Sequence, residues 1–315
     1  MGGRAQLIDD RGAAGESDDF FRCRPFYDAE GVTHTLRVEG DGWDIAVPLL
    51  VNEIAGTGFA DAISPYGYPG ASVHGSHSPP DPGQIDWSAV GLVSIFVRDR
   101  VGHEPILQGA TERSAVQVHD PARERNLRSR FADQIRSNER QGYTVEWVRG
   151  PDTTVEQRTS FHALYLETMR RNQAAERYFF DPDYFAGILA FERSWLVLCR
   201  SPEGSSAAGA IVALSDGLLH YCLGGTSEAH LSRSPFKNVA ASMMSLADEL
   251  HVPLNLGGGV WHGDGLEDFK RGFANAELPF RTHEIVCDPA AYARLSEGHA
   301  DDGFFPVYRT PTGRP

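Results

Sequence analysis

The stretch Trp195–Leu223 reads WLVLCRSPEGSSAAGAIVALSDGLLHYCL and holds three apolar runs separated by short polar segments. Runs of this length, rich in apolar and β-branched residues, predict strands at Trp195–Cys199, Ala207–Leu214 and Leu218–Leu223. The last two runs are joined by Ser-Asp-Gly, which is typical of a tight hairpin turn. The stretch therefore predicts three consecutive antiparallel strands.

Helical patterns flank these strands on both sides. Thr154–Glu176 repeats apolar residues at helical spacing, and a shorter helix runs from Pro182 to Phe191. Asp264 is a predicted N-cap. After the three strands the sequence predicts a helix at Lys237–Leu250 and a short strand at Pro253–Leu256. A helix at Gly265–Phe273 and a last strand at Arg281–Cys287 follow.

This order of elements resembles that of an acyltransferase domain of the GNAT type. The first half shows a sparser version of this order. It has a loop at Gly70–Gly83 and predicted strands at Val90–Val97 and Ala115–Val118. A predicted helix at Arg123–Gln141 and a strand at Tyr143–Val148 follow. We therefore predict an α/β (α+β) fold of two tandem GNAT-like domains, each a mixed, mostly antiparallel sheet flanked by helices.

The predicted domains have the following bounds. Residues 1–18 are interpreted as a disordered lead-in, because they are acidic and rich in Gly and Ala. Domain 1 comprises residues 19–149 and, at the end of the chain, residues 288–315. In the latter segment Phe304–Thr310 predicts a late strand, which has no partner nearby in the sequence. Domain 2 covers residues 150–287.

Composition excludes several classes of protein. The net charge of −14 argues against a broad basic face for nucleic acid and against a DNA-binding protein, but not against contact with an RNA end. No apolar run approaches the length of a membrane helix, and no secretory signal is apparent, so we expect a cytoplasmic protein without membrane insertion. The four cysteines form no CxxC pair and the histidines no HExxH motif, so no metal is expected.

The sequence also resembles the Fem-type (FemABX) branch of the GNAT clan, whose members transfer an amino acid from aminoacyl-tRNA onto an amine. Four stretches, spread over about residues 60–275, carry the resemblance: SPYGYPGA at Ser64–Ala71, RSRFADQIRSNERQGYTV at Arg128–Val145, FHALYLETMRRN at Phe161–Asn172, and GGGVWHGDGLEDFKRGF at Gly257–Phe273. The last stretch contains the family's Phe-Lys pair.

The resemblance implies an aminoacyltransferase that forms a peptide (amide) bond by direct attack of an amine on the ester of aminoacyl-tRNA. It implies no bound cofactor, since the charged tRNA is a co-substrate. The acceptor would be a small peptide, a natural-product amine as in antibiotic biosynthesis, or a cell-wall (peptidoglycan) precursor. The family's peptidoglycan members use a lysine in the N-terminal third, and this chain has none there.

Lys270 is one of only two lysines in the chain, and it follows Phe269 in the Phe-Lys pair. In the family this pair lies where the ester meets the amine, so the resemblance implies that Lys270 stabilises the oxyanion and that Phe269 stacks on the terminal adenine. A solvated lysine at the end of a helix is the alternative. Around them, glycines in Gly257–Gly259 suit a turn of positive φ or close approach of backbone N–H groups to the donor.

Four further residues are candidates on the donor side. Tyr221, in a predicted strand beside the meeting point of donor and amine, could relay a proton or simply pack in the sheet. Arg170 is the family's candidate for holding phosphate, although cations also favour helix C-termini. Lys237, at a helix start, could contact phosphate or be exposed. His262 could contact the RNA end, act as a base, or lie on a surface turn.

Three residues are candidates for binding the acceptor. Tyr66 and Tyr68 lie in a predicted loop, where aromatic residues favour binding, although they could equally belong to a core. Asp120 resembles the family's Asp after a domain 1 strand, but an Asp-Pro pair also commonly begins a helix.

Two other functions remain open. An acyl-CoA-dependent N-acyltransferase on the same fold needs a glycine-containing pyrophosphate loop before the long helix of domain 2, and the corresponding segment, SRSPFKNV at Ser232–Val239, has no glycine. A non-catalytic binding protein on the same scaffold would be expected to lack the Phe-Lys pair. No Cys/His or Ser/His arrangement indicates a covalent acyl-enzyme.

Overall fold

The structure is a computed structural model that describes residues 2–14, 17–75, 80–259, 263–300 and 303–310. The chain forms two compact units. The first unit comprises Met1–Ser17, Glu30–Arg113 and Pro279–Pro315, and the second comprises Asp18–Ala29 and Ser114–Leu278. The main boundary therefore lies at 113/114 and not at the expected 149/150, because the chain passes from one unit to the other in the middle of a strand.

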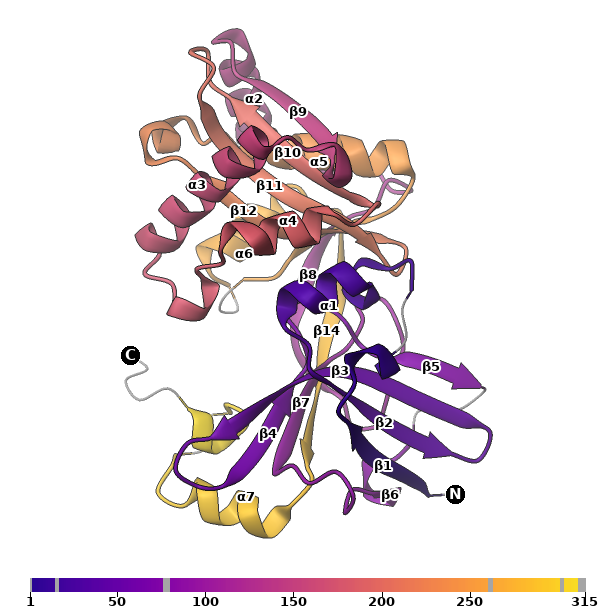
Figure 1. Cartoon of the computed structure of the whole chain (residues 1–315). Coiled ribbons are helices and arrows are strands. Elements are labelled where there is room, and N and C mark those ends of the chain that lie inside the picture. Colours follow the sequence, from indigo (N-terminus) through magenta and orange to yellow (C-terminus); the bar gives the residue numbers. More distant parts are fainter. Residues whose placement is uncertain (1, 15–16, 76–79, 260–262, 301–302, 311–315) are drawn as a thin grey trace. The chain divides into compact units, whose positions relative to one another are not determined.

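The first unit is a mixed sheet in the hydrogen-bonded order β6-β1-β2-β3-β4-β7-β14, with β5 paired to β3 (Figure 1). Its strands are β1 (Gly3–Ile8), β2 (His34–Gly40), β3 (Trp43–Ile54), β4 (Phe59–Ile63), β5 (Ser72–Gly75), β6 (Ile85–Asp86), β7 (Ser94–Arg98) and most of β14 (Ala276–Val286), and its helix is α7 (Pro289–Ser296). Alternate residues such as Leu36 and Val38 form the core with Ile45 and Val47.

The second unit has the strand order β8-β13-β12-β11-β10-β9. The strands are most of β8 (Thr111–His119), β9 (Thr144–Arg149), β10 (Ser194–Arg200), β11 (Ser206–Ser215), β12 (Leu218–Thr226) and β13 (Leu254–Gly257). The helices are α1 (Arg24–Glu30), α2 (Ser129–Arg140), α3 (Val155–Arg171), α4 (Pro182–Leu189), α5 (Phe236–Leu250) and α6 (Gly265–Arg271). Helices α3 and α4 cover one face of the sheet, and α5, with α2 packed on it, covers the other (Figure 1).

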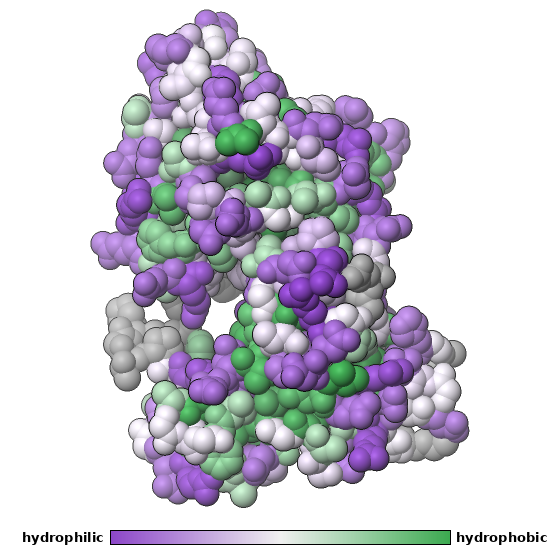
Figure 2. All heavy atoms as spheres, in the orientation of Figure 1, coloured by the Kyte–Doolittle hydropathy of each residue, from purple (hydrophilic) through white to green (hydrophobic). Residues whose placement is uncertain are grey.

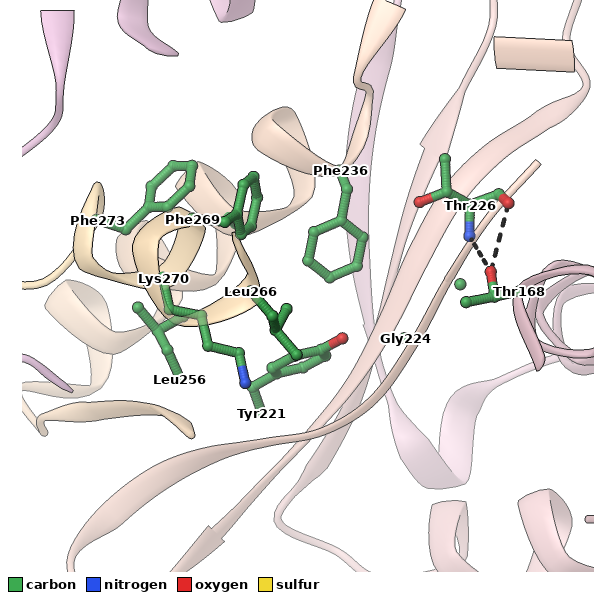
Figure 3. Close-up of a pocket in the computed structure, with 12 residues that line it drawn as sticks. Thr168, Tyr221, Gly224, Thr226, Phe236, Leu256, Leu266, Phe269, Lys270 and Phe273 are labelled. Atoms are coloured by element: carbon green, nitrogen blue, oxygen red, sulfur yellow. Dashed lines mark hydrogen bonds between the residues drawn. The ribbon is translucent and has the colours of Figure 1, made fainter. Parts of the chain in front are cut away.

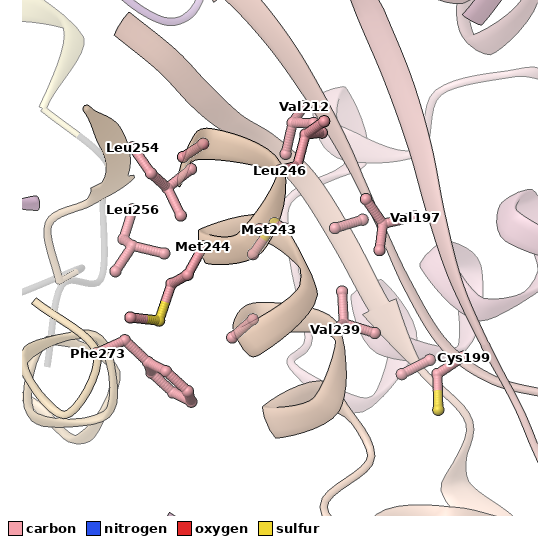
Figure 4. Packing of buried hydrophobic residues seen from close by; sticks show 14 of the residues in the cluster. Val197, Cys199, Val212, Val239, Met243, Met244, Leu246, Leu254, Leu256 and Phe273 are labelled. Carbon is pink, nitrogen blue, oxygen red and sulfur yellow. The ribbon is translucent and has the colours of Figure 1, made fainter. Parts of the chain in front are cut away.

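The alternation along β10 explains this two-sided packing. Trp195, Val197 and Cys199 belong to the cluster that packs against Val239 and Met243 of α5 (Figure 4). The residues between them are also buried, and successive side chains of a strand point to opposite faces, so they face α3 and α4. The continuous apolar run is therefore the expected signature of a strand that is covered on both sides.

Local signals place the helix starts. Thr154 and Gln157 form a reciprocal capping box at the start of α3, with hydrogen bonds of 3.1 and 2.9 Å. The predicted N-cap Asp264 accepts a hydrogen bond of 2.7 Å from the backbone N–H of Glu267 at the start of α6. Both helices therefore begin where the sequence predicts.

Three local predictions were wrong. The residues expected to be a disordered lead-in include β1, which pairs antiparallel with β2 and buries Ala5 completely. The late strand expected at Phe304–Thr310 is instead a 3-10 helix at Val307–Arg309, where Arg309 pairs with the buried Asp61. The helix expected from Arg123 begins only at Ser129. In each case long-range partners, which a local pattern does not contain, select the structure.

On the face in Figure 2, hydrophilic residues are spread over the surface of both units, and hydrophobic residues show as patches between them. None of the helices in the described part of the chain combines the length and the apolar character needed to cross a bilayer.

Candidate active site in the second unit

A pocket of about 160 Å³ lies within the second unit. Its walls come from α3, β12, α5, β13, α6 and the turn after α6 (Figure 3). Twelve residues line it: Thr168, Tyr221, Gly224, Gly225, Thr226, Phe236, Ala240, Leu256, Leu266, Phe269, Lys270 and Phe273. Three of these, Tyr221, Phe269 and Lys270, are predicted site residues.

The pocket forms where two parallel strands separate. Strands β12 and β13 share two residue pairs, Leu219 with Leu254 and His220 with Asn255. Tyr221 of β12 and Leu256 of β13, which both line the pocket, lie just beyond the paired segment. A register shift between β11 and β12 adds Cys222 as a bulged residue, and bulges redirect the side chains of a strand. The separation leaves a gap in the sheet that the side chains of α5 and α6 border.

Lys270 projects from α6 into this gap and is only 8% exposed. Its Nζ donates a hydrogen bond of 2.7 Å to the carbonyl oxygen of Gly258 and lies 5.7 Å from the centroid of the Tyr221 ring (Figure 3). Burial lowers the pKa of Lys270 to about 8, against a smaller opposing effect of the Asp264 carboxylate. The solvated lysine considered above is therefore excluded, and the ammonium is close to titration at physiological pH.

A chain of buried hydrogen bonds holds the turn that carries Gly258. The ring of His220 donates from Nε2 to the carbonyl of Ser215 (3.1 Å), so its Nδ1 accepts from the side-chain amide of Asn255 (3.1 Å). The other end of that amide, Oδ1, accepts from the backbone N–H of Gly257 (2.7 Å), which has a φ of +77°. Burial lowers the pKa of His220 to about 4, which keeps the ring in this neutral form.

Aromatic rings form one wall of the pocket. The Phe269 ring lies 6.1 Å from Phe236, 5.3 Å from Phe273 and 5.6 Å from Phe131, measured between centroids. Phe236 is also 5.6 Å from Tyr221. Phe269 is half-buried, and its neighbours hold it in place.

A basic cluster adjoins this aromatic wall. Three cations lie over the Phe131 ring, with Arg128, Arg130 and Lys237 at 5.1, 5.5 and 4.9 Å from its centroid. Asp268 pairs with Arg128 at 2.8 Å and more distantly with Arg130 at 3.6 Å. Burial, and then the charge of Arg130, lower the pKa of Lys237, which shows that like charges have been brought together. We call Arg128, Arg130 and Lys237 the basic cluster.

Other predicted donor residues lie elsewhere. Arg170 is exposed at the end of α3 and does not line the pocket. Its neighbour Arg171 instead binds the carbonyl of Thr226 (3.1 Å) and the hydroxyl of Thr168 (3.2 Å). Gly259 follows the carbonyl that holds Lys270. His262 lies outside the described residues.

The predicted acceptor residues are divided between the units. Tyr66 and Tyr68 lie in the first unit, where Tyr66 is 48% exposed and the Tyr68 ring contacts Phe280 edge to face at 5.4 Å. Asp120 lies in the second unit, where it accepts from the backbone N–H of Ala122 and pairs with Arg123. Asp120 therefore closes a turn and does not cap α2, which begins nine residues later.

Several residues in and around the pocket were not singled out by the sequence analysis. Thr168 lines the pocket, whereas Arg171 and Asn255 bind backbone groups of Thr226 and Gly257 beside it. Thr168 and Arg171 lie in the stretch FHALYLETMRRN that carries part of the resemblance, whereas Asn255 gave no signal. Phe236, beside Lys237 in the segment SRSPFKNV, could have been found by its place at the start of the long helix. No group of histidine, cysteine and carboxylate side chains in the described ranges is arranged to hold a metal ion.

No protein-family model matches the sequence, and no curated protein matches it. Solved structures do resemble the fold. FemX superposes with a TM-score of 0.55 at 14% identity, covering 82% of this chain and 90% of that one. The C-terminal domain (DUF2156) of a candidate lysylphosphatidylglycerol synthetase from Agrobacterium fabrum gives 0.52 at 15%, covering 80% and 83%. L-PGS from Bacillus licheniformis gives 0.52 at 12%, covering 78% and 82%. The chain therefore has a GNAT-like fold, a mixed sheet flanked by helices.

Proposed function

We propose that the protein is an acyltransferase, and more specifically that it moves an aminoacyl group from aminoacyl-tRNA onto the amine of a small acceptor. The observation that carries this proposal is the buried ammonium of Lys270 beside Tyr221, in a pocket between separating strands. Burying a cation is costly, and groups with pKa values shifted in this way cluster at functional sites. The GNAT-like fold and the names of its structural neighbours, FemX and a lysylphosphatidylglycerol synthetase candidate, support the same reaction class.

The proposed reaction needs no covalent enzyme intermediate. The acceptor nitrogen attacks the ester carbonyl, a C–N bond forms, the C–O bond to the tRNA ribose breaks, and the ribose oxygen leaves with a proton from the amine. Negative charge develops on the carbonyl oxygen, and Lys270 is the group that stabilises it. With a pKa of about 8, Lys270 is largely protonated at neutral pH. Tyr221 is the candidate for relaying the proton from nitrogen to the leaving oxygen.

The basic cluster supports a donor that carries phosphate. Asp268 balances part of the charge of Arg128 and Arg130, whereas Lys237 still feels the charge of Arg130, and a phosphate oxygen bound beside Lys237 would offset that repulsion. The adjoining ring of Phe269 suits stacking on an unpaired base. Both features fit the 3′ end of a tRNA, where a base and its phosphate are close to the aminoacyl ester.

The start of α5 favours tRNA over coenzyme A. A pyrophosphate loop presents backbone N–H groups to the ligand. Here the N–H groups of Lys237, Asn238 and Val239 already donate to Ser234 and Pro235, at 3.0, 3.0 and 3.3 Å. In this segment, which contains no glycine, the backbone N–H groups that would bind the pyrophosphate of acyl-CoA are therefore already hydrogen-bonded within the chain.

The proposed acceptor is a small peptide, a natural-product amine or a cell-wall precursor. Tyr66 and Tyr68 remain the proposed acceptor-binding residues of the first unit. Asp120 is the third proposed acceptor residue, and its carboxylate also closes a turn and pairs with Arg123.

One assay separates the proposed function from its rivals. The wild-type protein is incubated with total tRNA charged with labelled amino acids, with acetyl-CoA, and with a panel of amines, amino acids and dipeptides. Release of uncharged tRNA with formation of a labelled amide supports the proposal. Release of free coenzyme A identifies an N-acyltransferase instead, and absence of both products identifies a binding protein.

Matched variants make the assay specific to the site. Lys270→Ala should lower the rate of enzyme-dependent product formation by on the order of 100-fold or more. Arg140→Ala removes a positive charge from an exposed position at the end of α2, so it should react like the wild type. Equal loss in both variants would indicate an effect of net charge and would contradict a role for Lys270.

A further inference from the structure

We propose that the transferred aminoacyl group carries an uncharged, apolar side chain of about the size of leucine, methionine or phenylalanine, and that the pocket excludes lysyl and arginyl groups. This inference rests on the proposed function, because it assigns the pocket to the side chain of the donor. It follows from what lines the pocket and from how the polar atoms there are already engaged.

None of the twelve lining residues carries a carboxylate. Most of the wall is carbon, contributed by three phenylalanines, two leucines, one alanine and two glycines: Phe236, Phe269, Phe273, Leu256, Leu266, Ala240, Gly224 and Gly225. Walls of this composition favour apolar groups, since burial of apolar surface is the main source of affinity.

Two polar groups of the wall, the Thr168 hydroxyl and the Lys270 ammonium, already have hydrogen-bond partners within the protein. The Thr168 hydroxyl accepts from the backbone N–H of Thr226 at 2.9 Å (Figure 3). It donates to the carbonyl of Leu164 at 3.0 Å. Lys270 donates to Gly258. A polar side chain of the donor would lose its hydration and meet few partners, which is unfavourable.

The charge within the pocket opposes a cationic side chain. Lys270 supplies a buried positive charge, and like charges in a partly desolvated site repel strongly. The carboxylates of Glu267, on α6, and of Asp264, at its N-cap, already have partners in the protein. Glu267 accepts from the N–H of Gly263 at 2.7 Å and pairs with Arg271, and Asp264 caps the helix. A lysyl or arginyl group would therefore be buried beside a cation.

The volume of the pocket limits the size of the donor side chain that can enter it. Apolar cavities of about 150 Å³ in proteins accept benzene, and this pocket measures about 160 Å³. A leucyl, methionyl or phenylalanyl side chain fills such a space, whereas an alanyl side chain leaves most of it empty. A tryptophanyl side chain exceeds it unless Phe236 moves.

The test uses the full chain and tRNA charged in separate reactions with leucine, methionine, phenylalanine, alanine, lysine or arginine. Hydroxylamine serves as a small surrogate amine, and hydroxamate formation above the enzyme-free rate is measured. The apolar donors should exceed lysyl- and arginyl-tRNA in kcat/KM by on the order of 100-fold or more. Equal or better use of lysyl-tRNA would overturn the inference while leaving the proposed function intact.

A charge switch sharpens the test. Phe236 is the first residue of α5, where an acidic residue is compatible with the helix. Phe236→Glu should raise the ratio of lysyl to leucyl kcat/KM about 5- to 10-fold over the ratio of Phe236→Gln, which has the same shape without the charge. An unchanged ratio would show that the side chain of the donor lies elsewhere.

The side-chain preference of the pocket is also measured without any transfer step. L-leucinamide, L-phenylalaninamide and L-lysinamide are compared at equal concentration by their effect on the thermal unfolding midpoint of the wild type. Larger stabilisation by the apolar amides supports the inference. Larger stabilisation by lysinamide, or no difference among the three, overturns it.

Discussion

Lys270 combines a cost in stability with a proposed role in catalysis. A folded pKa of about 8 in place of 10.5 corresponds to a penalty of about 3 kcal/mol for keeping the ammonium charged in its buried site. The hydrogen bond to Gly258 recovers only part of this. A residue of this kind is expected to be retained for what it does and not for what it adds to folding.

Lys270→Met should therefore fold at least as stably as the wild type at pH 7. The unfolded chain binds the proton more tightly than the folded chain, so the wild-type free energy of unfolding rises with pH between about 8 and 10.5. The advantage of the variant should be largest below pH 8 and shrink toward pH 10.5. Urea unfolding across this range measures it, with Arg140→Met as control. A variant less stable by several kcal/mol at pH 7 would contradict a buried charge penalty.

Lys270→Ala should lower kcat and kcat/KM together by on the order of 100-fold or more, with acceptor affinity nearly unchanged, because the charge acts on the transition state. Lys270→Arg should recover little, since the planar guanidinium places its charge elsewhere. The kcat/KM profile of the wild type should fall above pH 8, and the residual activity of the Arg variant should lack this fall. Wild-type turnover by either folded variant would remove Lys270 from the mechanism.

At the scale of elements, the end of β13 positions the catalytic candidate. The strand separates from β12 after two residue pairs, and Asn255 then binds the backbone N–H of Gly257, so the carbonyl of Gly258 meets Lys270. Asn255 is 1% exposed and acts on Lys270 only through the turn at Gly257 and Gly258, so we interpret it as a positioning residue.

Asn255→Ala should lower kcat about 10-fold or more with little change in KM, because a small displacement of a charged group is costly. Loosening of the turn should also hydrate Lys270, so the alkaline limb of the pH profile should move from about 8 toward 10.5. Steady-state kinetics at several pH values measure both. A lower thermal unfolding midpoint with unchanged kcat and pH profile would show that Asn255 is only structural.

At the scale of the whole molecule, charge limits how RNA can bind. The net charge of −14 repels a polyanion, while the basic cluster offers a few local contacts. Binding of charged tRNA should therefore be weak and confined to the acceptor end. The slope of log K against log salt should correspond to no more than about three phosphates.

Lys237→Ala and Arg130→Ala should each reduce this slope by about one. Arg140→Ala, on the same helix as Arg130 but outside the cluster, should leave it unchanged. Titrations by fluorescence anisotropy at four salt concentrations test this. A steep wild-type slope would reveal a basic face beyond the cluster.

Most elements of the second unit, and one end of its site, could be predicted from the sequence. Hydrophobic runs, the Ser-Asp-Gly hairpin and the caps Thr154 and Asp264 act through residues a few positions apart, so they can be identified locally. Lys270 of the Phe-Lys pair could likewise be chosen as a site candidate, because the scarcity of lysine and the preceding glycine-rich turn are visible in the sequence.

The remaining features depend on how the chain packs. The bond of Arg171 to Thr226, the gathering of Tyr221 with Lys270, and the unit boundary at 113/114 depend on residues that are far apart in the chain. β1 was missed because its short alternating run gains stability only from pairing with β2. Burial, which moves the pKa of Lys270 to about 8, is a property of the packed unit and of no local segment.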